Sequence, residues 1–222
     1  MKPDLKLHKR LLEVCYKNDV HHLGSHFSSI DIIDDIYSRM SEDDIFILSN
    51  GHAAVALYVV IEKYFGINAE SLLKKHGDHP VLSEEDKIFC TTGSLGMGIT
   101  VAVGRAIANK KKRVFCMISD GECSEGSVWE SLKYLRKSGL ENIEIHVNMN
   151  GWGAFHEIEK ESLEKMLMSF YPKILIHHTT VEHYGLSGQE AHYVKFSEEQ
   201  YKKAVESLWE KNLQTIYLKS YK

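Results

Sequence analysis

The chain has 222 residues, of which 43% are hydrophobic and 26% are charged, and its formal net charge is −4. These values are typical of a soluble globular protein, and we predict a single α/β domain over residues 1–222. The short basic run at 110–113 precedes an apolar strand, which argues against nucleic-acid binding. The N-terminus is polar and no apolar stretch approaches about 18 residues, so we expect neither a signal peptide nor a membrane association.

The cysteines and histidines bear on compartment and chemistry. None of the four cysteines forms a Cys-x-x-Cys pair, and Cys90 and Cys116 lie in apolar runs, so we expect a reduced, cytoplasmic protein. Thirteen histidines is a high number for this length, and several of them lie next to glycines.

The first half of the chain alternates apolar helical patterns with glycine-containing loops. Ser28 or Ser29 is placed to cap a helix that begins with the following isoleucine. The elements expected here are a helix at 4–19, a helix at 30–40, a strand at 44–48, a helix from Ala53 and a helix at 99–109.

The clearest unit follows at residues 113–119, where an apolar run bounded by charge and by Asp-Gly predicts a buried parallel strand. A helix at 128–139, stopped by Gly139, and a strand at 143–147 complete a β-α-β unit. The remaining expected elements are a helix at 158–170, a strand at 173–177, a helix at 197–211 and a strand at 213–220. The predicted fold is therefore an open, mostly parallel α/β sheet flanked by helices.

Two polar loops follow neighbouring strands of this sheet. Asp120 and Glu122 come after the strand at 113–119, and Asn150 comes after the next strand. Ligands of open α/β sheets bind beyond the carboxyl ends of the strands, and Mg²⁺ prefers oxygen ligands shared with phosphates. Asp-Gly and Asn-Gly are each also common turns, so it is their pairing across one β-α-β unit that predicts a site for Mg²⁺ and a diphosphate.

Several segments, in family order, resemble the thiamine diphosphate-binding half of transketolases. SDGECSEGSVWESL followed by VNMNGW is similar to the thiamine diphosphate signature, with Ser119 in place of its first glycine. His79-Pro80 resembles a His-Pro pair near the sugar site, while His21 and Ser25 stand where the family has glycines. The other matching segments are HHLGSHFSSIDI, FILSNGHAAVALY and TTGSLGMGITVAVGRAIA.

The resemblance implies a role for individual residues. Asp120 and Asn150 would bind Mg²⁺ by their side chains, and Trp152 by its carbonyl oxygen. Glu125 would couple two cofactor sites across a dimer, although a carboxylate that stabilises a helix N-terminus is the alternative. The remaining residues would contact cofactor or sugar: Gly121 and Glu122 along the diphosphate, Gly93, Ser94 and Leu95 near the aminopyrimidine, and His22, His52 and His79 at the reacting carbon or the sugar. His177, His178 and His183 have no counterpart, and core packing or surface exposure is their default interpretation.

The resemblance also implies a divided enzyme. The glutamate that protonates the cofactor's pyrimidine ring belongs, in this family, to a second, pyrimidine-binding domain. We therefore expect the N-terminal subunit of a two-component transketolase-like transferase that moves a two-carbon ketol unit between small-molecule sugars, in modified-sugar biosynthesis. Its partner would be a C-terminal subunit, in a heterotetramer that is active only when complete. The alternatives are a subunit of a decarboxylating thiamine diphosphate enzyme and a cofactor-free scaffold or regulatory subunit.

Overall fold

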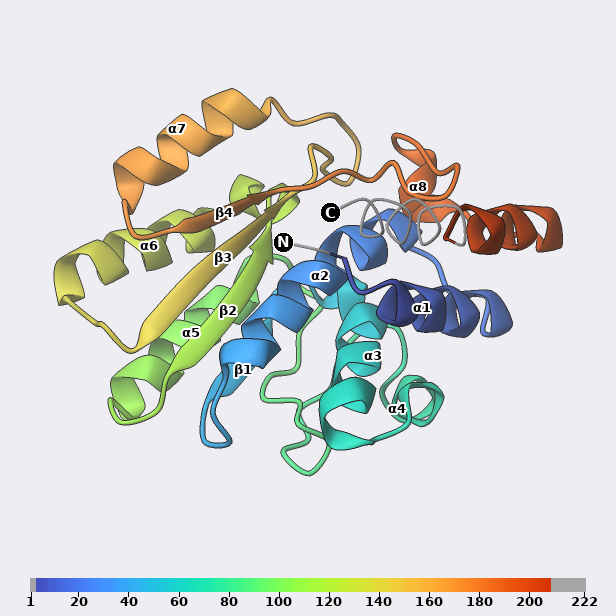
Figure 1. Cartoon of the computed structure of the whole chain (residues 1–222). Helices are drawn as coiled ribbons and strands as arrows, with labels where there is room; N and C mark the ends of the chain where they lie inside the picture. Colours follow the sequence, from blue (N-terminus) through green and yellow to red (C-terminus); the bar gives the residue numbers. More distant parts are fainter. Residues whose placement is uncertain (1–2, 209–222) are drawn as a thin grey trace, which may run out of the picture.

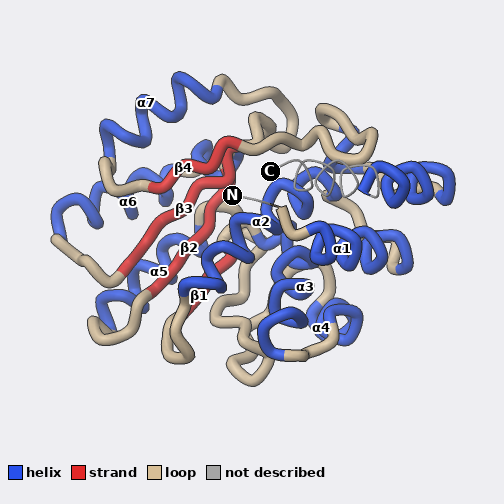
Figure 2. The backbone as a smooth tube through the Cα atoms, viewed as in Figure 1, coloured by secondary structure: helices blue, strands red, loops and turns tan. Residues whose placement is uncertain are grey.

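The computed structural model describes residues 3–208, which form one four-stranded sheet with helices on both of its faces (Figure 1). All three strand pairings are parallel, and the order in the sheet is the order in the chain (Figure 2). The prediction of an open, mostly parallel sheet is confirmed. The strands are β1 (Ile45–Leu48), β2 (Val114–Ser119), β3 (Ile143–Met149) and β4 (Leu175–His178).

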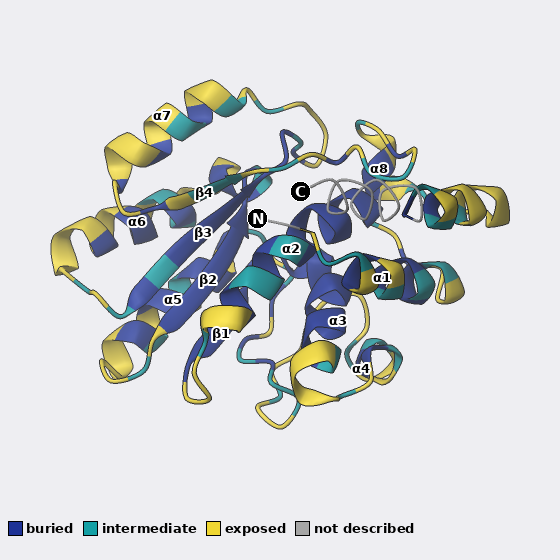
Figure 3. Cartoon of the chain, in the orientation of Figure 1, coloured by how far each residue is buried: buried dark blue, intermediate teal, exposed yellow. Residues whose placement is uncertain are grey.

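Alternate side chains of the strands enter two separate hydrophobic cores. On β2, Phe115 and Met117 face one core, whereas Cys116 and Ile118 face the other. Every residue of β2 is buried, as expected for a central strand covered on both sides (Figure 3). The first core is formed with α1 (Leu5–Lys17), α2 (Leu23–Arg39), α3 (Ala54–Phe65) and α4 (Ala69–His76), and the second with α5 (Met97–Ala108), α6 (Gly126–Ser138) and α7 (Lys160–Phe170).

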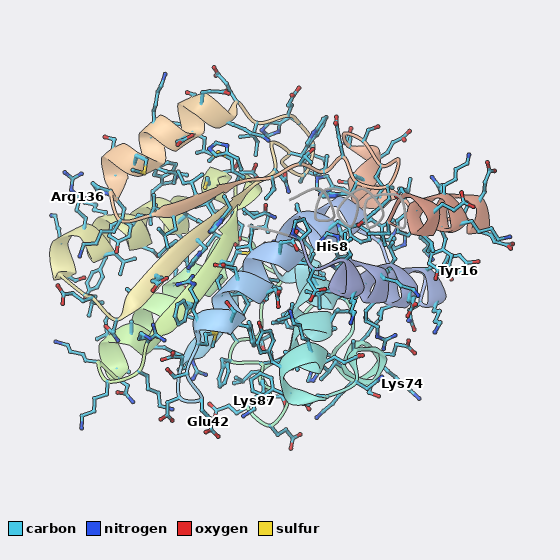
Figure 4. The ribbon with its side chains drawn as sticks, viewed as in Figure 1. His8, Tyr16, Glu42, Lys74, Lys87 and Arg136 are labelled. Carbon is cyan, nitrogen blue, oxygen red and sulfur yellow. The ribbon has the colours of Figure 1, made fainter. Side chains whose placement is uncertain are left out.

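Long-range contacts join neighbouring elements at the edges of these cores. Arg136 on α6 donates from Nη1 to the carbonyl oxygen of Ser169 near the end of α7, at 2.8 Å (Figure 4). Tyr16 on α1 stacks on Tyr201, with 4.2 Å between ring centroids, and Tyr201 lies in a helical segment at 198–208. The expected helix at 197–211 is thus present as far as residue 208, while the expected strand at 213–220 lies outside the described residues.

The start of α2 corrects one expectation. Ser28 and Ser29 do not cap a helix at residue 30, because α2 begins at Leu23 and buries both serines in its interior. Their hydroxyls accept hydrogen bonds from Nδ2 of Asn148 on β3, at 2.9 and 3.1 Å. A buried hydroxyl needs a partner, and both hydroxyls find one on a strand about 120 residues along the chain, while Ser28 also donates to the carbonyl oxygen of Ser25 at 3.3 Å.

Two further helices are absent from the predicted elements. The helix α4 begins after Asn68, whose Oδ1 accepts a hydrogen bond from the backbone N–H of Ser71 at 2.9 Å. Only Ala69 and Leu72 are buried in it, so its apolar pattern is weak. The four-residue helix α8 (Glu190–Tyr193) packs against α2.

No helix within residues 3–208 is both long enough and apolar enough to span a bilayer.

Candidate functional site

The loops that follow β2 and β3 meet at the carboxyl edge of the sheet. Asp120 is 1% exposed, and its Oδ2 accepts a hydrogen bond from the backbone N–H of Gly151 at 2.6 Å. Its Oδ1 accepts a second from the N–H of Gly121 at 3.0 Å. The carboxylate therefore ties the Asp-Gly turn to the Asn150-Gly151 turn, and the structure brings together the two turns that the sequence pairs.

Asp120 is a buried carboxylate without a close cation. No lysine, arginine or histidine nitrogen among the described residues lies within 4.0 Å of it. Burial raises its pKa to about 6, although the hydrogen bonds from Gly151 and Gly121 and the charge of Lys160 act in the opposite direction. A divalent cation would offset this desolvation, so the site fits a metal ion that also binds phosphate oxygens.

The donor set around Asp120 is short of protein carboxylates. The Oδ1 of Asn150 accepts a hydrogen bond from the N–H of Trp152 at 2.9 Å. A second lone pair on this oxygen remains for a metal ion. Within residues 3–208 no group of three or more histidine, cysteine, aspartate or glutamate side chains forms a metal centre. One carboxylate, one amide and one carbonyl make an incomplete shell, which suits Mg²⁺ bridged to a diphosphate.

Glu122 connects three loops of the site from the inside. Its Oε1 accepts hydrogen bonds from the hydroxyl of Ser49 at 2.6 Å and from the N–H of Gly96 at 2.8 Å. Its Oε2 accepts one from the N–H of Ser119 at 3.0 Å. The side chain is 0% exposed, and this desolvation raises its pKa while the three donors lower it. One carboxylate thus holds together the ends of β1 and β2 and the loop before α5.

Close backbone contact between these loops depends on two glycines. A Cβ at Gly98 would lie 2.5 Å from the Cα of Ser49, and a Cβ at Gly51 would lie 2.7 Å from the carbonyl carbon of Thr92. Neither contact is possible for a larger residue without moving the backbone. The glycines of the Asn-Gly-His and Gly-x-Gly segments therefore serve loop-to-loop packing as well as any ligand.

A cavity of about 220 Å³ opens beside the Asp120–Asn150 edge. Its walls combine the glycine-containing loops with side chains from α2, α8 and the loop after β3. Three histidines line it close together: the ring centroids of His22 and His52 are 5.3 Å apart, and those of His22 and His192 are 6.5 Å apart. The lining residues are His22, Ser25, His52, His79, Gly93, Leu95, Ser119, Gly121, Asn150, Trp152, Gly153, Ala154, His192 and Tyr193.

Burial favours the neutral form of three cavity histidines, His22, His52 and His192. Burial lowers the pKa of His22 and of His192, and it lowers the pKa of His52 to about 3. Neighbouring histidines lower these values further, because two imidazolium groups would repel each other. A neutral imidazole both donates and accepts hydrogen bonds, as a sugar hydroxyl requires. The Nε2 of His192 is buried and has no hydrogen-bond partner within residues 3–208, so it is available to a ligand.

The structure gathers most, but not all, of the predicted site residues at this cavity. His22, His52 and His79 line it with Gly93, Leu95, Gly121, Asn150 and Trp152. Ser94 and Glu125 are exposed outside it, and Glu122 lies beneath it. The roles assigned to all these residues stay predictions.

Four lining residues were not singled out from the sequence: Gly153, Ala154, His192 and Tyr193. His192 and Tyr193 follow a polar stretch without any motif, and only the packing of α8 on α2 brings them to the cavity. Among the histidines without a family counterpart, His177 hydrogen-bonds His146 across β3 and β4, and His178 pairs with Glu164. His183 packs near Phe27, so none of the three lines the cavity.

The comparisons with known proteins agree with this geometry. Residues 25–153 match the family model described as transketolase, thiamine diphosphate binding domain. The chain is 28% identical over 261 residues to one of the subunits of the apulose-4-phosphate transketolase of Phocaeicola vulgatus, covering 93% of this chain and 92% of that protein. It is 39% identical over 126 residues to human transketolase, covering 52% of this chain and 20% of the human protein. The fold is similar to that of transketolase from Leishmania mexicana, with a TM-score of 0.65, 18% identity, and coverage of 94% of this chain and 42% of the other.

The site lies at the carboxyl edge of the sheet of an α/β domain, beside a histidine-lined cavity. Because the family model matches more than half of its residues, the chain belongs to the transketolase thiamine diphosphate binding domain family. It covers 92% of the Phocaeicola protein, but it spans only 20% of human transketolase and 42% of the Leishmania chain.

The hydrogen bonds of Glu122 lead to a first prediction. In Glu122→Gln, the amide N–H₂ replaces one accepting oxygen and would face a backbone N–H or a hydroxyl donor, so that two donors point at each other. We therefore expect the free energy of unfolding to fall by about 2 kcal/mol. Urea unfolding followed by circular dichroism measures this loss. Glu125→Gln is the matched control, because Glu125 is exposed and its replacement should change stability by less than about 0.5 kcal/mol. Equal effects of the two variants would contradict the connecting role of Glu122.

The buried histidines predict a loss of stability in acid. Burial lowers the pKa of His26, as of His52, to about 3, whereas an unfolded histidine titrates near 6.5. Below pH 6.5 the unfolded chain therefore binds protons that the folded chain does not, and each histidine should cost about 2 kcal/mol between pH 7 and pH 5. The raised pKa of Asp120 has the opposite effect on stability, because on acidification the Asp120 carboxylate takes up its proton in the folded chain before it does so in the unfolded chain.

Comparison of variants isolates the contribution of one histidine. In His26→Gln, the difference in unfolding free energy between pH 7 and pH 5 should shrink by about 2 kcal/mol relative to the unmodified chain. His178→Gln, at a half-exposed side chain, should leave that difference unchanged. If the pH dependence of His26→Gln matched that of the unmodified chain, His26 would not be the neutral, buried group described above.

Proposed function

We propose that this chain is the N-terminal, cofactor-binding subunit of a two-component, transketolase-like transferase. The observation that carries the proposal is the buried Asp120 carboxylate, without a close cation, hydrogen-bonded to the Asn150 turn beside a histidine-lined cavity. The match to the thiamine diphosphate binding family gives that arrangement a specific ligand. The four free, buried cysteines fit a reducing cytoplasmic location.

The chain's own residues would hold Mg²⁺ and the diphosphate end of the cofactor. Asp120 and Asn150 would bind the metal by their side chains, and Trp152 by its carbonyl oxygen. Gly121 lies beside them with no side chain in the way, so a phosphate oxygen can approach the backbone. When bound, thiamine diphosphate supplies an electron sink for carbon–carbon bond cleavage. Gly93 and Leu95, which also line the cavity, would orient its ring system.

The histidines would act on the substrate. His22, His52 and His79 line the cavity, and burial lowers the pKa of His22 and of His52, so both are neutral at physiological pH. Neutral imidazoles would orient the hydroxyls of a ketose and of its acceptor, and pass a proton to or from a sugar oxygen. We assign the reaction as transfer of a two-carbon ketol unit between small sugars, in the synthesis of modified sugars.

A partner chain would complete the enzyme. The Phocaeicola relative is named as one subunit of its transketolase, and it matches this chain over nearly its full length. Complete transketolases carry more than twice as much chain as the part that matches here. We infer a C-terminal subunit with a pyrimidine-binding domain, in a heterotetramer whose cofactor lies between subunits.

Cofactor binding is tested by calorimetry. The chain with its partner should bind thiamine diphosphate in the presence of Mg²⁺, and Asp120→Asn should weaken that binding by about tenfold or more, because one oxygen ligand of the metal becomes a weaker amide. Asp43→Asn, at an aspartate 88% exposed, is the control and should bind normally. Binding that is unaffected by Asp120→Asn, or no binding at all, would instead favour a cofactor-free scaffold.

The reaction is tested with the two chains apart and together. Neither chain alone should transfer a ketol unit, whereas the mixture should. In analytical ultracentrifugation the mixture should have the mass of a heterotetramer. The same mixture should not consume pyruvate. Pyruvate consumption would assign the chain to a decarboxylating thiamine diphosphate enzyme, and activity of this chain alone would refute the divided site.

A further inference from the structure

One side of the cavity is closed by a contact between two distant segments. The hydroxyl of Tyr193, at the end of α8, donates a hydrogen bond to the carbonyl oxygen of Ala154, in the loop after β3, at 2.9 Å. Both residues line the cavity. We call this contact the Tyr193–Ala154 bridge.

The backbone of α8 is fixed at the start of α2. The N–H of His22 donates to the carbonyl oxygen of His192 at 3.1 Å, and the ring Nδ1 of His21 lies 3.1 Å from the carbonyl oxygen of Tyr193. Gly24 allows this approach, since a Cβ there would lie 2.8 Å from the Cβ of Ala191. Tyr193 is therefore held in place by its own main chain, and its side chain is not needed to secure α8.

The ring of Tyr193 lies at the histidine end of the cavity. Its centroid is 6.4 Å from that of His22, and both rings line the same cavity. The ring remains 50% exposed, whereas its neighbours Ala191 and His192 are buried. Core packing thus accounts for Ala191 and His192 but not for Tyr193, whose ring and hydroxyl instead span the gap to the facing loop.

We propose that Tyr193 is a specificity-determining residue, which narrows the histidine end of the cavity and admits small polyhydroxylated carbonyl compounds but not sugars with bulky substituents. The reaction in which it acts is the proposed function above. The cavity has a volume of about 220 Å³ in this chain, and Tyr193 and Ala154 both line it. Removing the tyrosine ring would open the cavity between α8 and the loop after β3.

Chemical modification of the chain tests this closure without any cofactor or turnover. Diethyl pyrocarbonate reacts with neutral imidazoles, and peptide mass spectrometry gives the rate at each histidine. In Tyr193→Phe, loss of one hydrogen bond should speed the reaction of His22 about fivefold, and Tyr193→Ala should speed it further. His178, on β4 and outside the cavity, is the internal reference.

Tyr134→Ala is the matched control, because Tyr134 on α6 is 47% exposed and does not line the cavity. It should leave the rate at His22 unchanged. Equal rates at His22 in Tyr193→Ala and in the unmodified chain would overturn the proposal, because the bridge would then not close the cavity.

Turnover by the assembled two-chain enzyme tests the selectivity. The ratio of kcat/KM for ribose 5-phosphate to that for glycolaldehyde, as acceptors, should rise by about tenfold or more in Tyr193→Ala and stay unchanged in Tyr134→Ala. An equal loss of kcat with both acceptors would show a general role in the reaction and overturn the assignment to specificity. If the unmodified enzyme has no turnover, the proposed function fails, and the modification rates still decide whether Tyr193 closes the cavity.

Discussion

The buried carboxylate of Glu122, which forms no ion pair within residues 3–208, is the constraint on which the site depends. Glu122 has lost its water, and its charge is compatible with burial only if donors surround it. Two of those donors, Ser49 and Gly96, come from segments far from Glu122 in the chain, and the third comes from Ser119 at the end of β2, three residues before it. The carboxylate therefore fixes the distances between these loops, and with them the wall of the cavity that carries His52 and Leu95.

Asp120 and Glu122 are two residues apart, but their carboxylates receive different numbers of hydrogen bonds from the protein. Glu122 receives its hydrogen bonds from three protein loops, so it serves the architecture beneath the cavity. Asp120 receives two, from the turns on either side of it, and its pKa of about 6 shows that burial is not fully compensated. The carboxylate with fewer protein donors is the one suited to a metal ion, and the one with more donors holds the loops in place.

The cavity has a wall that the family resemblance does not describe. Residues 25–153 match the family model, but His192 and Tyr193 lie beyond that range and reach the cavity through α8. The loop that carries Ala154 is also at the end of the match. In our proposal, residues within the family match hold the diphosphate and contribute His52 and His79 toward the substrate, and α8 adds His192 and Tyr193 to the same cavity.

Short-range patterns in the sequence by itself determined the sheet and the Asp-Gly and Asn-Gly turns, and the resemblance to a family pointed to most of the residues that line the cavity. Apolar runs such as 113–119 and turn dipeptides depend on neighbours a few positions away, so the residues alone predict them. Only the tertiary structure decided that Ser28 and Ser29 bond to Asn148, that Glu122 faces inward, and that His192 and Tyr193 reach the cavity. Each of these depends on partners brought together by packing, and a buried polar group finds its partner wherever the fold provides one rather than at a fixed spacing in the chain.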